Sequence, residues 1–463
     1  MFLKGKSVPL RRRGPRLNPR RLIFWLFLAV CALIYLGLIN EKVIDVPLVP
    51  TAEPTRTALS YAEEAHAQFA AGKFEKAVEA YGGALALDPK NVDYNVGKAR
   101  AYIFADQGVE ALQAANDALL AAPDSAKSKA IQAWALYWNG NVDEARSAAV
   151  QAVTLDQNYA PAHAYYSFIL NSSSNWDQGL REARQALQLD PTLIEAHWAL
   201  GFSNEAVGNY EGAITHYQNA LQLNPNVISL YLQAGVNYRT LGDRAAADGL
   251  KRQSDIYFEQ AIAYINKAIA VDPNNVGPYL SLGRTYIKID QLGAAQQAYD
   301  RALEIEPENP VIHGRQGLLL FKRLNYEGAE APLRLALFGG EYEWEDAQGN
   351  SQKAVVQPLP LTDASLEFYY TFANLQTNFY RCGAGPDEAP AMLRLVLNQY
   401  PDDPVVQNVY SAGMETCRIY NSWTPTPGPA EQTATAIAAS PLATPTPGGT
   451  QAPPRAPQST STP

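Results

Sequence analysis

Residues 194–227 show two stretches of helical periodicity separated by a short turn. Small and aromatic residues recur at helical spacing in both stretches, and Gly208 interrupts the pattern between them. Gly201 and Ala213 are small, so the two predicted helices can approach closely at these positions. Pro225 has no amide hydrogen to donate and therefore ends the second helix. The pattern predicts a helix–turn–helix unit of 34 residues.

Prolines in one register indicate that this unit is repeated along the chain. Their spacings are 34, 68, 34, 48, 34 and 94 residues, which correspond to one unit, two units, or units with insertions of 14 and 26 residues. The prolines are Pro89, Pro123, Pro191, Pro225, Pro273, Pro307 and Pro401. The units cover residues 58 to about 420, and their alanine-rich helical pattern favours an all-α fold.

This period and residue pattern resemble the tetratricopeptide repeat, or TPR. The resemblance implies an all-α fold, a right-handed superhelical solenoid of TPR helix-turn-helix repeats over residues 58–422. About nine repeats are expected, followed by a capping helix over residues 404–421. A cap is expected because a terminal repeat has no neighbour to cover its apolar face.

Two insertions depart from the repeat. The first, near residues 244–257, adds 14 residues, and two interpretations remain open. Fourteen residues are close to four helical turns and are consistent with a longer second helix, whereas Gly249 favours a loop. The second insertion, near residues 339–362, has alternating residues around a Gly-Asn turn. It predicts either a β-hairpin or a disordered acidic loop.

The start of the chain has a strong charge asymmetry. Residues 1–21 carry eight Lys and Arg residues and no acid, and residues 22–39 carry no charge. Eighteen helical residues span about 27 Å, enough for a bilayer core. Because a basic flank stays in the cytoplasm, we expect a transmembrane signal anchor with the solenoid outside the cytoplasm, as in bacterial membrane-anchored TPR proteins. A cleaved signal peptide is the alternative, but no small-residue cleavage site follows Ile39.

Two further segments have a composition that cannot form a core. Residues 40–57 hold three prolines and predict a short extended linker. Residues 423–463 contain ten prolines and nine threonines and predict a disordered tail. The tail is either a passive spacer or an attachment to the cell envelope.

The search for chemistry gives mostly negative expectations. His163, His197 and His313 share the fourth position of their repeats, which favours a packing role over catalysis. His66 and His216 have no cysteine or carboxylate partner at metal-ligand spacing. Motifs for phosphate binding or nucleophilic catalysis do not occur, so we expect no enzyme, no cofactor and no metal. The net charge of −9 becomes −17 beyond residue 21, which argues against a nucleic-acid partner.

The cysteines leave one question open. Cys31 lies in the predicted membrane span, and only Cys382 and Cys417 remain. These two are 35 residues apart, about one repeat, so they fall near matching ends of neighbouring helices. Outside the cytoplasm they are a candidate disulfide, and two free buried thiols are the alternative.

The resemblance to TPR solenoids also implies a binding face. In that family the first helices of the repeats line a concave groove, and here their groove positions hold an aromatic patch with basic residues at its margins. The predicted groove residues are Arg100, Trp134, Tyr137, Trp138, Phe168, Asn171, Trp198, Phe202, Arg239, Arg284 and Lys288. Aromatics bordered by arginines are typical of interface hot spots, but the same rings are also suited to packing between neighbouring helices.

The carboxylate clamp of chaperone-binding relatives is not carried over, because Ala62, His66, Val96 and Arg100 do not supply its residues. We therefore expect a membrane-anchored scaffold that binds a protein or peptide partner with apolar anchors and some acidic character. The alternative is a structural or assembly component of a cell-envelope, pilus or secretion complex. The sequence does not identify the partner or the oligomeric state.

Overall fold

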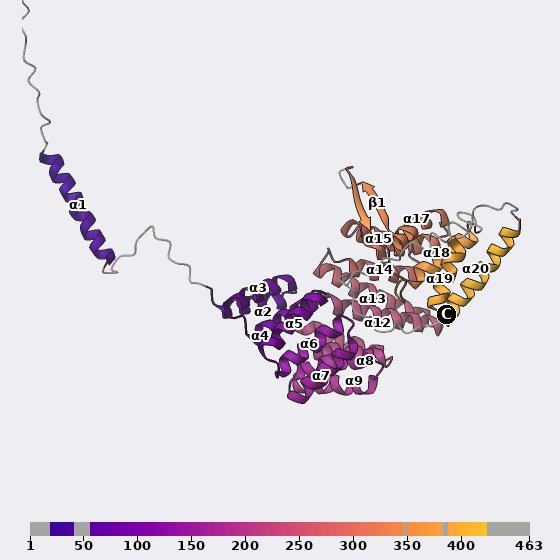
Figure 1. The fold of residues 1–463 in the computed structure, drawn as a ribbon, viewed down its shortest axis with the longest axis horizontal. Coiled ribbons are helices and arrows are strands. Elements are labelled where there is room, and N and C mark those ends of the chain that lie inside the picture. The colour runs from indigo at the N-terminus through magenta and orange to yellow at the C-terminus, as the bar shows by residue number, and fades with distance from the viewer. Residues whose placement is uncertain (1–18, 41–55, 346–348, 381, 383–387, 424–463) are drawn as a thin grey trace, which may run out of the picture. The chain divides into compact units, whose positions relative to one another are not determined.

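The computed structural model describes residues 19–40, 56–345, 349–380, 382 and 388–423, which fall into two units (Figure 1). The first unit contains α1 (Pro19–Asn40), and the second begins at Thr57. Among the described residues no helix is long and apolar enough to cross a membrane, so the span expected at 22–39 is unconfirmed. Most of the basic segment, the linker and the Pro/Thr-rich tail lie outside the described residues.

The second unit begins with eight consecutive antiparallel helix pairs, where the sequence predicts about nine repeats and a cap. The helices are α2 (Ala58–Ala70), α3 (Phe74–Leu87), α4 (Val92–Phe104), α5 (Gly108–Ala121), α6 (Ala126–Trp138), α7 (Val142–Leu155), α8 (Ala160–Ser172), α9 (Trp176–Leu189), α10 (Ile194–Ala206), α11 (Tyr210–Leu223), α12 (Ile228–Ala247), α13 (Lys251–Val271), α14 (Val276–Lys288), α15 (Leu292–Ile305), α16 (Pro310–Lys322) and α17 (Tyr326–Phe338). The even-numbered helix comes first in each pair.

Within a pair, a small residue on the first helix faces a large one on the second. The ring of Tyr217 occupies the place where a side chain at Gly201 would begin, and Tyr299 stands in the same way against Gly283. Ala213 is completely buried at the same interface. Close approach of the two helices therefore depends on the glycine and on the ring that fills the space beside it.

The first insertion lengthens both helices of one pair. The α12 helix has 20 residues and α13 has 21, whereas α10 and α11 have 13 and 14. The inserted residues are thus shared equally between the two helices. Gly249 lies in the turn between them with φ of 73°, a conformation that favours glycine. Each of the two sequence interpretations accounts for part of the insertion.

The second insertion forms a β-hairpin. Strands β1 (Gly340–Glu345) and β2 (Ser351–Val356) are antiparallel, and Glu343 lies opposite Lys353. The hairpin follows α17 directly (Figure 1). Tyr342 packs on His313 of α16, with their ring centres 4.6 Å apart, and this contact fixes one face of the hairpin to the helices.

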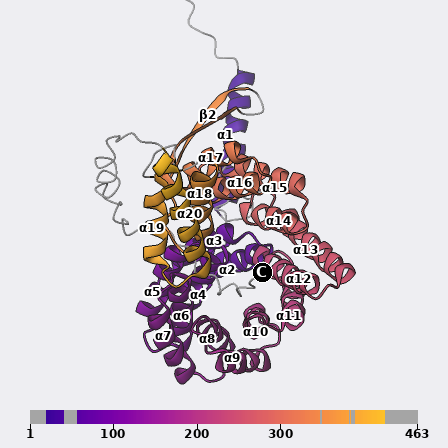
Figure 2. The same cartoon turned by 90° about the vertical axis from the view of Figure 1, so that its right-hand side faces the viewer.

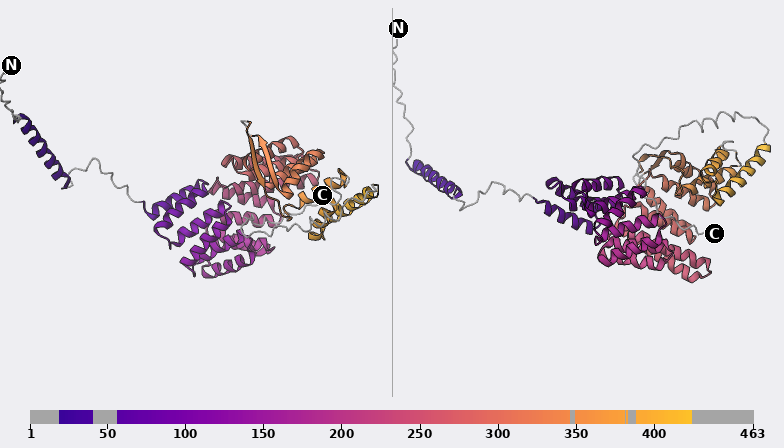
Figure 3. Two further views of the ribbon diagram at one scale, coloured as in Figure 1. Left: turned by 45° about the horizontal axis from the view of Figure 1, so that its top comes forward. Right: turned by 60° about the horizontal axis from the view of Figure 1, so that its bottom comes forward.

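Three helices complete the described chain (Figure 3): α18 (Leu366–Asn378), α19 (Glu388–Gln399) and α20 (Pro404–Trp423). The α20 helix packs against both α18 and α19, in the position of the expected cap. Cys382 and Cys417 form a disulfide with their Cα atoms 5.3 Å apart. The bridge joins the segment after α18 to α20 and constrains the end of the solenoid.

The helices from α2 to α11 curl into a closed turn, in which the last pair comes back to the first (Figure 2). The side-chain amide of Asn224 donates a hydrogen bond to the carbonyl oxygen of Phe69 at 3.3 Å, and that of Asn226 donates to Ala70 at 3.1 Å. The segment after α11 and the end of α2, which are about 155 residues apart in the chain, are therefore in direct contact. We call residues 58–226 the closed turn.

A buried ion pair crosses the inside of the closed turn. The guanidinium of Arg100 on α4 donates to both carboxylate oxygens of Glu195 on α10, at 2.5 and 3.0 Å. Burial disfavours the charged guanidinium, but the carboxylate of Glu195 outweighs this effect and raises the pKa of Arg100 above its ordinary value. The same guanidinium lies 4.3 Å from the ring centre of Phe69.

Replacing Glu195 by glutamine tests how much this ion pair stabilises the closed turn. Glu195→Gln leaves the guanidinium without its counter-charge, and we expect the free energy of unfolding to fall by about 3 kcal/mol. Urea titration followed by circular dichroism measures the change. The matched control is Asp93→Asn, which breaks the exposed pair with Lys127 and should cost less than about 1 kcal/mol. Equal effects of the two substitutions would contradict a special role for the buried pair.

Candidate functional site

The predicted aromatic patch lies inside the closed turn. Trp134 is completely buried and stacks on Tyr165, with ring centres 4.2 Å apart. The ring centre of Trp198 lies 6.4 Å from that of Trp134 and 5.6 Å from that of Phe168, edge-on in both cases. The other buried members of the predicted patch are Tyr137 and Phe202. These rings form one continuous core with the alanines of the surrounding helices.

This packing corrects the expectation of an open aromatic groove. The first helices α4, α6, α8 and α10 curl so tightly that their inner faces meet, and each ring is covered by others from the facing helices. These side chains pack between helices, which is the alternative that the sequence left open. Trp138 is the half-exposed member, and its indole N–H donates to Asp106 at 3.1 Å. A partner would have to displace the rings in order to reach them.

Two polar members of the predicted set also serve the closed turn. Arg100 is the cation of the buried ion pair. Asn171 is buried, and its amide donates to the hydroxyl of Ser203 at 2.7 Å. The contact of Arg100 joins α4 to α10 across the closed turn, and that of Asn171 joins the neighbouring first helices α8 and α10.

The remaining predicted residues lie beyond the closed turn, on α12 and α14. Arg239 is buried, Arg284 is half-buried, and Lys288 is exposed and pairs with Asp243 at 3.3 Å. The structure adds Arg315 of α16, which donates to Glu367 at 3.0 Å. We call the side of α12, α14 and α16 that carries Arg239, Arg284, Lys288 and Arg315 the basic inner face.

A buried tyrosine hydroxyl lies close to these arginines. Tyr299 on α15 is completely buried, and within the described chain its hydroxyl has no hydrogen-bond partner. Burial raises the pKa of Tyr299 to about 12; the charges of Arg315, Arg284 and Arg239 oppose this rise, and the charge of Glu367 adds to it. The hydroxyl is thus a buried donor with more positive than negative charge in its surroundings, which suits an anionic acceptor such as a carboxylate.

The equivalent tyrosine in the closed turn has the partners that Tyr299 lacks. Tyr217 occupies the same repeat position, and its hydroxyl donates to the carboxylate of Glu205 at 3.0 Å. Asn237 of the next repeat donates to the same carboxylate at 2.9 Å. At the corresponding positions around Tyr299 the chain has Ile287 and Leu319. Alignment of the repeats by their glycines therefore provides a sequence signal for this site that single-position analysis missed.

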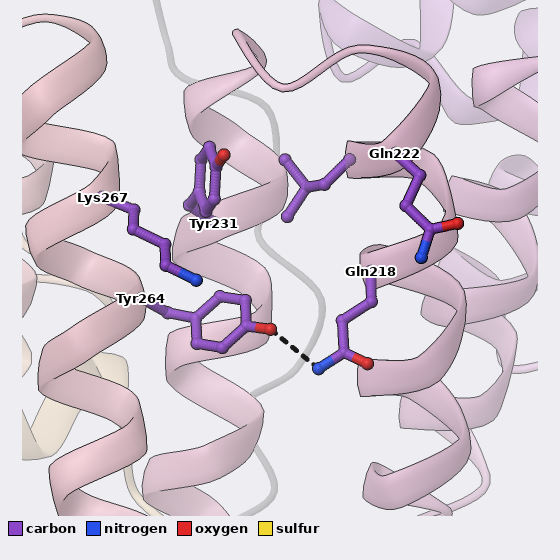
Figure 4. A pocket seen from close by; sticks show the side chains of 6 residues that line it. Gln218, Gln222, Tyr231, Tyr264 and Lys267 are labelled. Atoms are coloured by element: carbon purple, nitrogen blue, oxygen red, sulfur yellow. Dashed lines mark hydrogen bonds between the residues drawn. The ribbon is translucent and has the colours of Figure 1, made fainter.

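A second, smaller feature is a cleft of about 270 Å³ between α11 and α13 (Figure 4). It is lined by Gln218, Leu221, Gln222, Tyr231, Tyr264 and Lys267. The amide of Gln218 donates to the hydroxyl of Tyr264 at 2.7 Å, and the ammonium of Lys267 lies 4.6 Å from the Tyr264 ring centre. This mixture of amides, rings and one cation can hold a small polar group. No sequence pattern predicts this cleft, because its residues come from three separate helices.

Comparison with known families agrees with the repeat architecture. The tetratricopeptide repeat profile matches residues 68–135 and 258–333, and a second profile of the same name matches residues 194–227. The chain is a TPR protein. The family is generally non-enzymatic, and its repeats indicate a scaffold for protein–protein interaction.

Solved structures show a similar fold at low sequence identity. The human IFIT1 dimer with m7Gppp-AAAA is 15% identical, covers 77% of this chain and 81% of its own, and has a TM-score of 0.54. A monomeric IFIT1 mutant with Gppp-AAAA is 14% identical over 82% and 84% of the two chains, also with a TM-score of 0.54. The APC/C Cut9–Hcn1 hetero-tetramer gives 18% identity and a TM-score of 0.48 over 60% of this chain. The match spans about half of that chain, 52%.

At these identities the likeness extends to the fold alone. No curated protein sequence gives a significant match.

The two tyrosines form a matched pair for mutation. Tyr217→Phe removes a donor from the buried carboxylate of Glu205, and we expect it to lower the free energy of unfolding by about 1–3 kcal/mol. Tyr299→Phe removes a buried hydroxyl that lacks a partner, so it should leave the free energy of unfolding unchanged or raise it by up to about 1–3 kcal/mol. Chemical denaturation of both variants measures the difference. Equal destabilisation would mean that the Tyr299 hydroxyl is already satisfied in the free protein.

Proposed function

We propose that this TPR protein is a membrane-anchored scaffold that holds a protein or peptide partner on the basic inner face, outside the cytoplasm. The partner supplies at least one carboxylate and several apolar side chains. The observation that carries the proposal is the buried Tyr299 hydroxyl, which has no acceptor among the described residues and has arginines from three first helices around it.

The Tyr299 hydroxyl is completely buried, so the side chains that cover it would have to move aside before a partner could reach it. A carboxylate from the partner would then do for Tyr299 what Glu205 does for Tyr217. It would accept the hydroxyl hydrogen in a region where Arg284 and Arg315 contribute positive charge. Charge-assisted hydrogen bonds of this kind are short and give orientation as well as affinity. The partner therefore needs a carboxylate at one particular place on the basic inner face.

Apolar anchors have a place beside this carboxylate position. Leu280, Ile287 and Leu318 are half-buried and occupy repeat positions that line the concave face in TPR proteins. Apolar side chains with nearby cations fit an amphipathic helix or an extended peptide with alternating acidic and apolar residues. The closed turn offers no equivalent surface within the described residues, because its own rings fill the inner face.

The membrane anchor is proposed from the sequence around residues 22–39. This segment has no charge and follows eight basic residues. The large side chains of Ile23, Phe24 and Trp25 are exposed on α1, as expected of a helix that needs an apolar environment. The Cys382–Cys417 disulfide supports an oxidising location for the solenoid, because such bonds rarely persist in the cytoplasm.

We do not propose for this chain the RNA ligands that are named for the IFIT1 structures. Phosphate binding depends on an excess of positive charge, and the chain beyond residue 21 carries a net charge of −17. An assembly role in a cell-envelope, pilus or secretion complex stays the alternative to a scaffold with a discrete partner.

Site-specific photo-crosslinking tests the binding face. A photoreactive residue replaces Lys288 on the inner face or, as a control, the exposed Arg252 on α13. In intact membranes we expect a discrete crosslinked partner from position 288 only. Adding Arg284→Glu should reduce that crosslink at least about tenfold, the equivalent of 1.4 kcal/mol, because the carboxylate would meet a like charge.

Arg252→Glu, combined with the photoreactive residue at position 288, controls for the change in net charge. Circular dichroism confirms that each variant is folded. Identical crosslinks from both positions would contradict the proposal that a partner binds the basic inner face. A crosslink that Arg284→Glu leaves unchanged would contradict it too. Crosslinks that spread over many envelope proteins would favour the assembly alternative.

Cysteine labelling in intact cells tests the anchor and its orientation. Full-length chains carrying Ser7→Cys or Lys288→Cys are treated with a membrane-impermeant maleimide. We expect Lys288→Cys to react in intact cells and Ser7→Cys to react only after permeabilisation. Absence of residue 7 from the mature chain would indicate a cleaved signal peptide. If only Ser7→Cys is labelled in intact cells, the orientation is the opposite of the one proposed.

A further inference from the structure

The histidines that share a repeat position have a common backbone contact. The Nε2 atom of His163 lies 3.0 Å from the carbonyl oxygen of Gln157, and that of His313 lies 2.8 Å from Pro307. His197 makes the same bond to Pro191. A carbonyl oxygen can only accept, so Nε2 carries the hydrogen in each case. The other ring nitrogen, Nδ1, is then free to accept or to coordinate.

In the α8–α9 pair this second nitrogen has a carboxylate partner. The Nδ1 atom of His163 lies 2.7 Å from Glu182 on α9. Burial lowers the pKa of His163, but the bonds to Glu182 and Gln157 outweigh this and raise it overall, as expected when both ring nitrogens donate. This pair is a complete ion pair with no open coordination position.

In the next repeat a histidine takes the place of the carboxylate. His197 and His216 lie 34 residues after His163 and Glu182, at the same positions of the α10–α11 pair. Their ring centres are 5.9 Å apart and the ring planes are inclined by 34°. Both Nδ1 atoms are buried, and neither has a hydrogen-bond partner in the described part of the chain. Both rings are half-exposed, and their Nδ1 atoms are buried.

We propose that Nδ1 of His197 and Nδ1 of His216 together bind one divalent transition-metal ion of the class that prefers imidazole, namely Zn²⁺, Cu²⁺ or Ni²⁺. With metal–nitrogen bonds of about 2 Å, two imidazole rings on one ion have centres roughly 5 to 6 Å apart, which the observed spacing fits. The backbone carbonyl of Pro191 holds the His197 ring in the tautomer that presents Nδ1, as is usual for metal-ligating histidines.

The site supplies two protein ligands and leaves positions open for water or for a donor from a bound partner. In the described residues no group of three or more His, Cys, Asp or Glu side chains is arranged to hold a metal. The ion would therefore bind reversibly, and it would satisfy two buried lone pairs that otherwise lower the stability of the fold. It would join α10 to α11, which carry His197 and His216.

Metal titration of the full chain, purified in detergent and stripped with a chelator, tests the site. Calorimetric titration with Zn²⁺ should show one ion per chain. His197→Gln and His216→Gln should each weaken binding at least about tenfold, since each removes one of two ligands. The control is His66→Gln, an exposed histidine outside the pair, which should bind Zn²⁺ as the wild type does.

Electron paramagnetic resonance of the wild type with one equivalent of Cu²⁺ gives a readout that does not depend on the folding of the variants. Two coordinated imidazole nitrogens are expected in the wild type and one in each variant. Absence of stoichiometric Zn²⁺ binding, or a Cu²⁺ spectrum that neither substitution changes, would overturn the assignment. Circular dichroism separates lost binding from lost fold in the variants.

Discussion

The buried ion pair between Arg100 and Glu195 sets the shape on which the rest of this solenoid depends. It connects the second helix pair to the fifth, across the inside of the curl, and so it selects one curvature from the many that stacked helix pairs allow. Asn224 and Asn226 reinforce the same closure at the helix turns. Glu195 needs this partner because its carboxylate is completely buried and would otherwise remain without a compensating charge, whereas Arg100 is partly exposed.

Closure divides the inner side of the solenoid into two regions with different roles. Inside the closed turn, Trp134, Phe168 and Trp198 fill the space and stabilise the curl. Beyond it, the lengthened α12 and α13 begin a second region whose inner side carries arginines and half-buried aliphatic residues. The first region provides rigidity, and the second retains the polar groups that a partner can satisfy.

Repetition makes individual sites interpretable, because equivalent positions serve as internal controls. Tyr217 has a carboxylate acceptor, and Tyr299 has arginines in its surroundings but no acceptor within the described residues. His163 faces a carboxylate, and His197 faces another histidine. In both comparisons the fold is unchanged while one intramolecular partner is replaced. Candidate binding sites arise where a repeat keeps its geometry and one of its buried polar groups has lost the hydrogen-bond partner that it has in another repeat.

The sequence by itself determined the local architecture. Helical periodicity, glycines at close approaches and prolines after second helices predict the helix pairs of the repeats, and the Gly-Asn turn is consistent with the β-hairpin. These features follow from interactions within one repeat or between neighbours. The curvature was decided only in three dimensions, because small rotations between successive pairs accumulate until Arg100 meets Glu195. The burial of the aromatic patch depends on this long-range geometry, whereas the Cys382–Cys417 bridge and the missing acceptor of Tyr299 depend on contacts within one repeat or between neighbours.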